Sequence, residues 1–528
     1  MTSPFRRDEA LERLGSERFD VLVVGGGITG AGVALDAAAR GLRTALVERS
    51  DFASGTSSKS SKLVHGGLRY LQQRDVALVR ESLAERRRLL ANAPHLVTPL
   101  PFDVPLPGGG GVVARGYATA LLAYDACGGW RIGHRHRRLD AGEILADLPF
   151  LAPGAAGEGF QYYDAFADDA RLTLAVVRTA VLAHGAVAAN HAPVEGLLTD
   201  AGERVHGVTL AGGTDVRAEV VVNAAGVWAD AVDALHDPAH RHRLRPAKGV
   251  HLTLERRRLP CRTAAVLPVP GDKRSIFVVP WGERVVLGTT DTEHDGPLDD
   301  PACTTADVAY LLDAANAALA EPLAPADVVG IWAGLRPLLD RDGSTRTVDL
   351  SRRHRVSVAG NLVTVTGGKL TTYRRMAADT VDAAVGILGH GPRRSPTRSL
   401  PLWGASAPGD RLASRYGTEA ADVEALVDAD PTLGDPLVPG LPYTRAEAVF
   451  AARSEMALTL DDVLSRRTRA RILDARASAA AAADVARLLA PELGWSEDRA
   501  REEAAAYAAS VARERAAAGL SDVSGKRP

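Results

Sequence analysis

Fifteen consecutive residues, 56–70, concentrate side chains suited to binding and proton transfer. The run reads Thr-Ser-Ser-Lys-Ser-Ser-Lys-Leu-Val-His-Gly-Gly-Leu-Arg-Tyr. Hydroxyls and lysines can hold phosphate oxygens, and glycines let the backbone approach a flat ring closely. Such a run forms either a polar surface loop or the wall of a binding site, and the neighbouring elements decide between the two.

Two later clusters place cations beside glycines. Trp332–Leu338 contains Arg336, and Thr366–Tyr373 contains Lys369 directly after a Gly-Gly pair. Because the second cluster reads as a junction between a strand and a helix, its free N–H groups favour an anion. Arginine suits two-pronged phosphate recognition. For any single arginine, a solvated surface charge is the alternative reading.

Two histidines are candidate general bases, His65 in the first run and His251 in Lys-Gly-Val-His. A histidine pKa near 6.5 suits removal of a hydroxyl proton. The alternative for each is a structural hydrogen bond. His65 is slightly favoured, because it lies in the denser run, and Arg336 is a further candidate, for polarising a hydroxyl.

The elements that must position these groups begin with an apolar strand from Phe19 that enters a glycine turn and a helix. Gly25, Gly27 and Gly30 form G-x-G-x-x-G, and Glu48 ends the next apolar run, eighteen positions after the last glycine. This pattern predicts a dinucleotide whose pyrophosphate lies at the helix N-terminus and whose ribose meets the acid. The run 56–70 follows directly, which favours its binding role.

The rest of the chain divides by its pattern. An amphipathic helix is predicted over Asp75–Leu90, and Ala218–Gly226 reads as a second strand returning to the cofactor. A hairpin is predicted from 275–280 and 285–289. Residues 389–409 read as a linker, and residues 410–520 have helical spacing with almost no strand signal.

The amino-acid composition argues against several classes of protein. A chain of 528 residues needs two or three domains, and a net charge of -2 argues against a nucleic-acid partner. The three cysteines are far apart, which fits a reducing, cytoplasmic setting and excludes a cysteine-based metal site. No metal is expected. The sequence contains no run of eighteen apolar residues, so no membrane-spanning helix is predicted.

Four motifs in order carry a resemblance to a known family. They are Val-Gly-Gly-Gly-Ile-Thr-Gly-Ala-Gly, the run 56–71, Gly-Leu-Arg-Pro-Leu and Thr-Gly-Gly-Lys-Leu-Thr-Thr-Tyr-Arg. Together they resemble the FAD-dependent, membrane-associated glycerol-3-phosphate dehydrogenases. Ser60–Leu71 is the most specific stretch, because related amine and amino-acid oxidases share the glycine motif without it. The runs at 443–447 and 461–469 extend the resemblance to nearly the full length.

The resemblance implies an α/β fold with a Rossmann-type FAD-binding domain of the glutathione-reductase and D-amino-acid-oxidase type. It also implies a β-rich substrate domain and an all-helical C-terminal domain. We expect an oxidoreductase unit over 19–400 and the helical domain over 410–528. The expected FAD-binding segments are about 19–100, 165–245 and 345–390, and the expected substrate segments are about 100–165 and 246–345.

The resemblance also implies site residues. The predicted FAD contacts are Gly25, Gly27, Gly30, Glu48, Ser57, Ser58, Lys62, His65, Ala225, Gly226, Gly367, Gly368, Lys369, Leu370 and Thr371. The predicted substrate contacts are Arg69, Tyr70, Arg336, Arg352 and Lys369, with Arg353 as the alternative to Arg352.

The implied reaction is oxidation of sn-glycerol 3-phosphate to dihydroxyacetone phosphate, with hydride transfer to FAD and electrons passed to a quinone. The closest alternative is a glycerophosphate oxidase that reduces oxygen to hydrogen peroxide. An NAD-dependent dehydrogenase would not explain the run 56–70, and a non-catalytic flavin-binding protein would not need Arg69, Arg336 and Lys369. Further implied features are a homodimer and a peripheral position on the inner face of the cell membrane.

Overall fold

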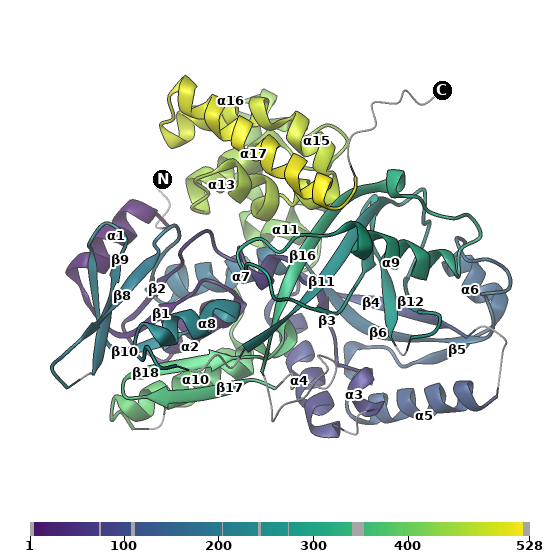
Figure 1. Cartoon of the computed structure of the whole chain (residues 1–528), viewed down its shortest axis with the longest axis horizontal. Helices are drawn as coiled ribbons and strands as arrows, with labels where there is room; N and C mark the ends of the chain where they lie inside the picture. The colour runs from purple at the N-terminus through teal and green to yellow at the C-terminus, as the bar shows by residue number, and fades with distance from the viewer. Residues whose placement is uncertain are drawn as a thin grey trace.

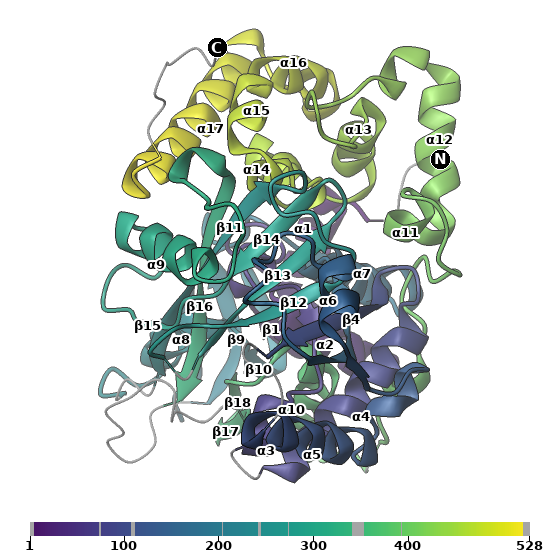
Figure 2. The same ribbon diagram turned by 90° about the vertical axis from the view of Figure 1, so that its right-hand side faces the viewer.

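The computed structural model describes residues 5–72, 75–106, 111–202, 204–240, 244–272, 274–339, 353–391 and 393–520. Two β-sheets lie next to each other, and a group of helices from the C-terminal part of the chain covers one end of both (Figure 1). Figure 2 shows the same group above the second sheet.

The first sheet carries the glycine turn. Its order is β17-β18-β10-β1-β2-β7, with β9 pairing β10 and β8 pairing β9. The strands are β1 Arg18–Val24, β2 Thr44–Val47, β7 Val187–Ala189, β8 Val194–Thr199, β9 Val205–Leu210, β10 Asp215–Asn223, β17 Arg355–Ala359 and β18 Leu362–Thr366. β1 pairs in parallel with both β2 and β10, so its apolar run is buried on both faces.

Helices flank this first sheet. They are α1 Arg7–Ser16, α2 Ile28–Ala39, α7 Asp169–Arg178, α8 Ala229–Ala234 and α10 Tyr373–Ile387. Glycine at position 32 lets α2 pack closely on α10, because a Cβ there would lie 2.7 Å from the Tyr373 ring. The pair therefore fixes the direction in which the N-terminus of α2 points.

The second sheet forms the wall opposite the glycine turn. Its order is β15-β11-β14-β13-β12-β4-β6-β3, with β16 pairing β11 and β5 pairing β6. The strands are β3 Leu63–Val64, β4 Val97–Pro105, β5 Arg137–Leu139, β6 Gly159–Ala167, β11 Leu244–Glu255, β12 Ala264–Pro268, β13 Ser275–Trp281, β14 Arg284–Gly288, β15 Thr292–Glu293 and β16 Val328–Leu339. The short strand β3 is the direct link, since it leaves the first sheet's loop and pairs with β6.

The remaining helices surround the second sheet and form the C-terminal domain. The former are α3 Arg69–Gln72, α4 Val76–Asn92, α5 Val112–Ala126, α6 Ala141–Asp147 and α9 Thr305–Asn316. The latter are α11 Ala413–Tyr416, α12 Ala420–Ala429, α13 Arg445–Ser454, α14 Ala470–Leu473, α15 Ala475–Ala480, α16 Ala482–Leu493 and α17 Glu497–Ala517. Among the helices of the described residues, none has the length and apolar character needed to cross a membrane.

Most of the expected elements are present. The helix predicted over Asp75–Leu90 is α4, capped by the Asp75 carboxylate, and the predicted hairpin is β13 with β14. The predicted fold class is confirmed by the two sheets and the helical C-terminal domain. The domain limits stay a prediction, and the pairing of β3 shows that the segment 19–100 already contributes to the second sheet.

Candidate functional site

The glycine turn between β1 and α2 is built as a cradle for an anion. Gly25 has φ +110°, and a Cβ at Gly30 would lie 1.9 Å from the Gly25 carbonyl oxygen, so no larger residue fits there. Gly27 precedes α2 and supplies no side-chain cap. The Ile28 N–H donates to Ser57 Oγ at 2.8 Å, which places this predicted hydroxyl at the helix N-terminus.

Glu48 lies beside this cradle at the end of β2. Its carboxylate accepts from the N–H groups of Gly26 at 2.7 Å and Ser50 at 2.9 Å. Burial raises the pKa of this carboxyl above its usual value. A carboxylate has about four acceptor positions, so these two bonds leave capacity for ribose hydroxyls.

The end of β10 closes the other side of the cradle. A Cβ at Gly25 would lie 3.0 Å from Ala225 Cα, and Gly226 adopts φ +62°. The parallel pairing of β1 with β10 aligns Val24 with Asn223 and so brings both chain turns to one edge. The predicted residues Ala225 and Gly226 therefore lie against the glycine turn.

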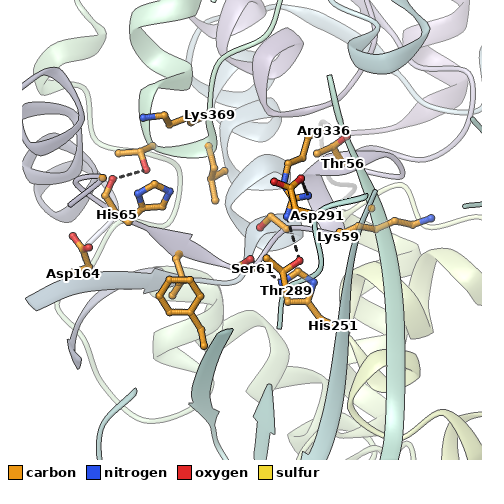
Figure 3. A pocket seen from close by; sticks show the side chains of 18 of the residues that line it. Thr56, Lys59, Ser61, His65, Asp164, His251, Thr289, Asp291, Arg336 and Lys369 are labelled. Carbon is orange, nitrogen blue, oxygen red and sulfur yellow. Dashed lines mark hydrogen bonds and ion pairs between the residues drawn. The ribbon is translucent and has the colours of Figure 1, made fainter. Parts of the chain in front are cut away.

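Between the two sheets lies a cavity of about 330 Å³. Figure 3 shows His65 and Lys369 on one side of it and Arg336, Asp291, Thr289 and His251 on the other. Of the residues predicted as site residues, the cavity is lined by His65, Tyr70, His251, Arg336, Gly368, Lys369, Leu370 and Thr371. The structure thus brings together residues that are up to 306 positions apart in the chain, since Thr371 Oγ1 donates to the His65 carbonyl oxygen at 3.2 Å.

Arg336 reaches the cavity from β16 across β11. Its guanidinium donates to Asp291 Oδ1, Thr289 Oγ1 and the Thr290 carbonyl, each at 3.2 Å. A Cβ at Gly249 would lie 2.5 Å from Arg336 Nη2, so the glycine leaves room for this crossing. The side chain remains 25% exposed, which leaves it accessible to an anion in the cavity.

Lys369 supplies the cation on the opposite side. Its ammonium lies 3.8 Å from the centre of the Tyr70 ring and 3.4 Å from Ser82 Oγ. The turn before it requires glycine, because a Cβ at Gly368 would lie 2.2 Å from Met376 Sδ. Gly367 and Gly368 both have positive φ, which fits a tight approach of this turn to a ring system.

His251 is held rigidly in the cavity wall. Its ring stacks on Trp332 with centroids 4.8 Å apart, and its Nε2 lies 2.7 Å from Ser61 Oγ. Burial and the nearby cations Lys62 and Arg336 hold the pKa of His251 well below 6.5, so the ring is neutral. Its Nδ1 is buried with no hydrogen-bond partner on the described residues.

Lys62 has a different environment from the one expected of a cofactor contact. Its side chain is fully buried and is absent from the cavity lining. The ammonium donates to Asp169 at 3.1 Å and to the carbonyls of Ser58 and Ser60 at 3.2 and 3.3 Å. The observed contacts of Lys62 are therefore structural, and its contact with FAD stays a prediction.

Three further arginines were predicted for the substrate site, and only Arg353 has its side chain among the described residues. Arg69 begins α3, but its side chain lies outside the described residues, as does the whole of Arg352. Arg353 is described, and its guanidinium donates to Asp75 Oδ1 at 2.7 Å. It does not line the cavity. The substrate contacts of Arg69 and Arg352 stay predictions.

Several cavity residues were not predicted from the sequence. They are Thr56, Lys59, Phe102, Tyr162, Asp164, Arg274, Phe277, Thr289 and Asp291. Arg274 donates to the Asp291 carbonyl at 3.1 Å, so it belongs to the same network as Arg336. Lys59 lies inside the run 56–70 and could have been included on that basis.

The sequence of this chain is similar to families of known proteins. Residues 20–374 match the family model described as FAD dependent oxidoreductase, and residues 395–500 match the C-terminal domain of alpha-glycerophosphate oxidase. Glycerol-3-phosphate dehydrogenase 2 of Mycobacterium tuberculosis is 42% identical over 96% of this chain and 90% of that protein. The glycerol-3-phosphate dehydrogenase of Mycobacterium leprae shows the same identity and coverage.

Two solved structures share the fold of this chain. The glycerol-3-phosphate dehydrogenase of Bacillus halodurans, complexed with FAD, is 31% identical with a TM-score of 0.77 and covers all of both chains. The L-alpha-glycerophosphate oxidase of Mycoplasma pneumoniae is 17% identical with a TM-score of 0.57 and shares the fold over 73% of this chain and 99% of its own. The glycine cradle fits the FAD predicted for it. The chain belongs to the FAD-dependent glycerol-3-phosphate dehydrogenases.

Proposed function

We propose that the protein oxidises sn-glycerol 3-phosphate to dihydroxyacetone phosphate in the cavity between the two sheets. The observation that carries this proposal is the placement of Arg336 and Lys369 on opposite sides of a cavity lined by Thr56, the residue before Ser57 of the glycine cradle. The substrate is a small dianion with a secondary alcohol, and the names of the 42% identical relatives support it.

The residues around the cavity have different roles in binding the substrate, according to their positions. Bound FAD supplies the acceptor for the hydride that leaves the alcohol carbon. Arg336 can bind phosphate in a two-pronged manner, since Asp291 and Thr289 fix the plane of its guanidinium. Lys369 adds a second positive charge across the cavity. Because two cations bracket the anion, glycerol without a phosphate group should bind poorly.

His251 is the better placed of the two candidate bases. It is neutral, its ring is fixed by Trp332, and Ser61 holds its Nε2. A bound dianion would raise its pKa toward neutrality, because an opposite charge favours the imidazolium. We expect His251→Gln to slow flavin reduction by about a hundredfold and His65→Gln to slow it less, both measured by stopped flow. The reverse order would transfer the role to His65.

We propose a quinone as the acceptor of the electrons, by the family resemblance. Oxygen is the second candidate, because the C-terminal model that matches residues 395–500 carries the name of an oxidase. The test reduces the enzyme anaerobically with glycerol 3-phosphate and then mixes it with a quinone analogue or with oxygen. Fast reoxidation by the quinone, with little hydrogen peroxide, supports the proposal. Fast reoxidation by oxygen with stoichiometric peroxide would replace it.

We propose an anionic membrane surface as a partner, docked through α5 and the turn Gly129–Ile132. This part of the chain exposes Val112 by 84%, Val113 by 63%, Leu122 by 61% and Trp130 by 49%. Exposed arginines at 115, 131 and 135 accompany these side chains. Apolar side chains with neighbouring cations are the pattern of an interfacial anchor.

The membrane proposal is tested by co-sedimentation with vesicles that contain phosphatidylglycerol. Val113→Asp should reduce binding at least about fivefold. The matched control is Val358→Asp, a change at another exposed valine, on β17 and 53% exposed, which should leave binding unchanged. Equal vesicle binding by both variants would show that α5 is not part of the membrane-binding surface.

The cellular location and the oligomeric state of the protein are also proposals. We propose the cytoplasmic face of the membrane as the location, supported by three cysteines that are all free. We propose a homodimer, by the family resemblance, which light scattering on the purified protein measures directly. A mass near 55.5 kDa would show a monomer instead.

A further inference from the structure

A short segment of the C-terminal domain enters the boundary between the two sheets. It comprises the π-helical turn Asp462–Arg467, the residues Thr468 and Arg469, and α14. α14 packs on β16 and β11, the strands that carry Arg336 and His251 (Figure 2). A Cβ at Gly330 would lie 2.0 Å from the Ile472 carbonyl oxygen, and Thr253 Oγ1 donates to the same oxygen at 2.6 Å.

Arg469 is the residue of this segment that reaches the run 56–70. Its side chain is only 1% exposed, although arginine is usually a surface residue. Its Nη2 donates to the Ser58 carbonyl at 2.6 Å and to Asp169 Oδ1 at 3.1 Å. Its backbone takes φ +71°, a conformation that L-residues adopt rarely and that surrounding contacts must hold.

Asp169 connects Arg469 to the rest of the loop. The Asp169 carboxylate accepts from the Ser60 N–H at 3.0 Å, from Ser60 Oγ at 2.7 Å and from Lys62 Nζ at 3.1 Å. Lys62 Nζ also donates to the Ser58 carbonyl that Arg469 holds. One carboxylate and one carbonyl thus join two buried cations, and they fix the backbone on both sides of Ser61.

The side chain of Ser61 points to the cavity from this fixed loop. Its Oγ lies 2.7 Å from His251 Nε2, and this hydrogen bond sets the orientation of the imidazole. The path from the C-terminal domain to the cavity is therefore short: Arg469, the Ser58–Lys62 backbone, the Ser61 hydroxyl and the His251 ring.

A second contact anchors the same segment. Arg467 donates to both carboxylate oxygens of Asp51 at 2.6 and 2.8 Å, and Arg466 donates to Asp51 Oδ2 at 2.5 Å. Asp51, His191 and Asp462 have ligand atoms within 4.8 Å of one another, the spacing of a cation site. The two guanidinium groups already neutralise this cluster, so it serves as an anchor.

We propose that Arg469 is a positioning residue for the reaction in the cavity. It holds the loop Ser58–Lys62 so that Ser61 orients His251, and the C-terminal helical domain thereby takes part in the chemistry without contacting the substrate. This inference rests on the proposed function, in which His251 accepts the hydroxyl proton.

The energetic reason for this coupling is the burial of the cluster, in which Lys62, Asp169 and Arg469 are at most 1% exposed. The pKa of Lys62 is lowered to about 8, because burial and the neighbouring Arg469 lower it more than Asp169 raises it. A buried carboxylate that compensates two cations cannot move without leaving a charge unpaired. The loop is therefore held in one arrangement as long as Arg469 is present.

The test variant is Arg469→Lys, which keeps the positive charge but cannot reach Ser58, Asp169 and Ser465 together as the forked guanidinium does. The matched control is Arg471→Lys, two residues along. The side-chain partners of Arg471 are Glu514, Asp461 and Ser510, all within the C-terminal domain. Both variants are studied as the FAD-loaded full chain.

The first measurement is flavin reduction by saturating glycerol 3-phosphate in stopped flow. Arg469→Lys should slow it at least about tenfold, because small displacements of positioned groups cost one to two orders of magnitude. Arg471→Lys should stay within about twofold of wild type. In a double-mutant cycle, Ser61→Ala combined with Arg469→Lys should be no slower than the slower single variant, since both act through one hydrogen bond.

The second measurement does not depend on turnover. Hydrogen exchange read by mass spectrometry should become faster in the peptide that contains 58–62 for Arg469→Lys and stay unchanged for Arg471→Lys. Unchanged exchange, an unchanged reduction rate, or effects of the two substitutions that multiply would each overturn the inference. If wild type is not reduced by glycerol 3-phosphate, the proposed function fails. The exchange result then still decides whether Arg469 holds the loop.

Discussion

The cations of the cavity and the cations of the domain boundary are chemically alike but differ in what surrounds them. Arg336 is 25% exposed and shares its guanidinium among a carboxylate, a hydroxyl and a carbonyl. At the boundary, Lys62 and Arg469 are 0% and 1% exposed, and both are bound to the fully buried Asp169. Arg336 remains accessible to an anion in the cavity, while Lys62 and Arg469 are enclosed with their partner.

This difference separates binding residues from structural ones more reliably than residue type does. A buried ion pair costs desolvation in both partners, so removing one partner leaves an uncompensated charge. A half-exposed cation at a cavity loses little when it is empty and gains a strong contact when an anion enters. Substitutions that remove a charge at the boundary should therefore affect folding first, and those in the cavity should affect kinetics first.

The largest effect is expected for Asp51→Asn at the boundary. It removes the charge of a buried carboxylate that Arg466 and Arg467 share, both at least nine-tenths buried, and should destabilise the protein by about 3–5 kcal/mol. Chemical denaturation followed by tryptophan fluorescence measures the loss. The control is Asp484→Asn, whose partner Arg487 is exposed and which should not shift the midpoint. Equal midpoints for both variants would contradict the distinction.

The next effect is expected for Arg336→Ala in the cavity. Its kcat/KM for glycerol 3-phosphate should fall by about 10²–10³, because a charged, two-pronged contact to phosphate is lost. The amount of bound FAD should remain near the wild-type level. Arg258→Ala, in the turn after β11 and paired with Asp327, serves as the control and should retain full kcat/KM. Normal kinetics for Arg336→Ala would exclude it from substrate binding.

The smallest effect concerns His95, a boundary histidine whose Nδ1 is buried without a hydrogen-bond partner on the described residues. Burial and Arg171 lower the pKa of His95 to about 4 from its usual 6.5. The unfolded chain therefore binds a proton that the folded chain does not, and this contribution to stability falls as pH drops from 6.5 toward 4. Between pH 7 and pH 5 the loss is about 2 kcal/mol.

His95→Gln should remove this part of the acid sensitivity, since glutamine does not titrate. The measurement compares denaturation of wild type and variant at pH 7 and pH 5. The difference between the two proteins should narrow at the lower pH. A constant difference across this range would show that His95 titrates normally.

The sequence predicted the parts of the site that local chemistry requires. Gly25, Gly27 and Gly30 are recognisable because only glycine fits between β1 and α2, and Glu48 follows at a fixed spacing. Arg336 and Lys369 are recognisable as cations in glycine-containing clusters, and His251 as a side chain suited to proton removal. These signals are local and can be read without a structure.

The remaining residues depend on contacts between distant segments. Arg469 meets Asp169 across 300 positions, and Lys62 meets the same carboxylate across 107 positions. Nothing in the local pattern distinguishes a lysine that faces a cavity from one that is buried behind it. The same reason explains why Arg274 and Asp291 were missed, since their place in the network is set by strand pairing.

The most direct test of the central claim compares two alcohols that differ only in the phosphate group. Purified enzyme with bound FAD is mixed anaerobically with sn-glycerol 3-phosphate or with glycerol, and the flavin absorbance is followed in wild type and in Arg336→Ala. Complete bleaching of wild type by the phosphate ester alone, with Arg336→Ala at least a hundredfold slower, is the predicted result. Equal bleaching by both alcohols, or none by either, would contradict the proposal that this cavity oxidises a phosphate-bearing alcohol.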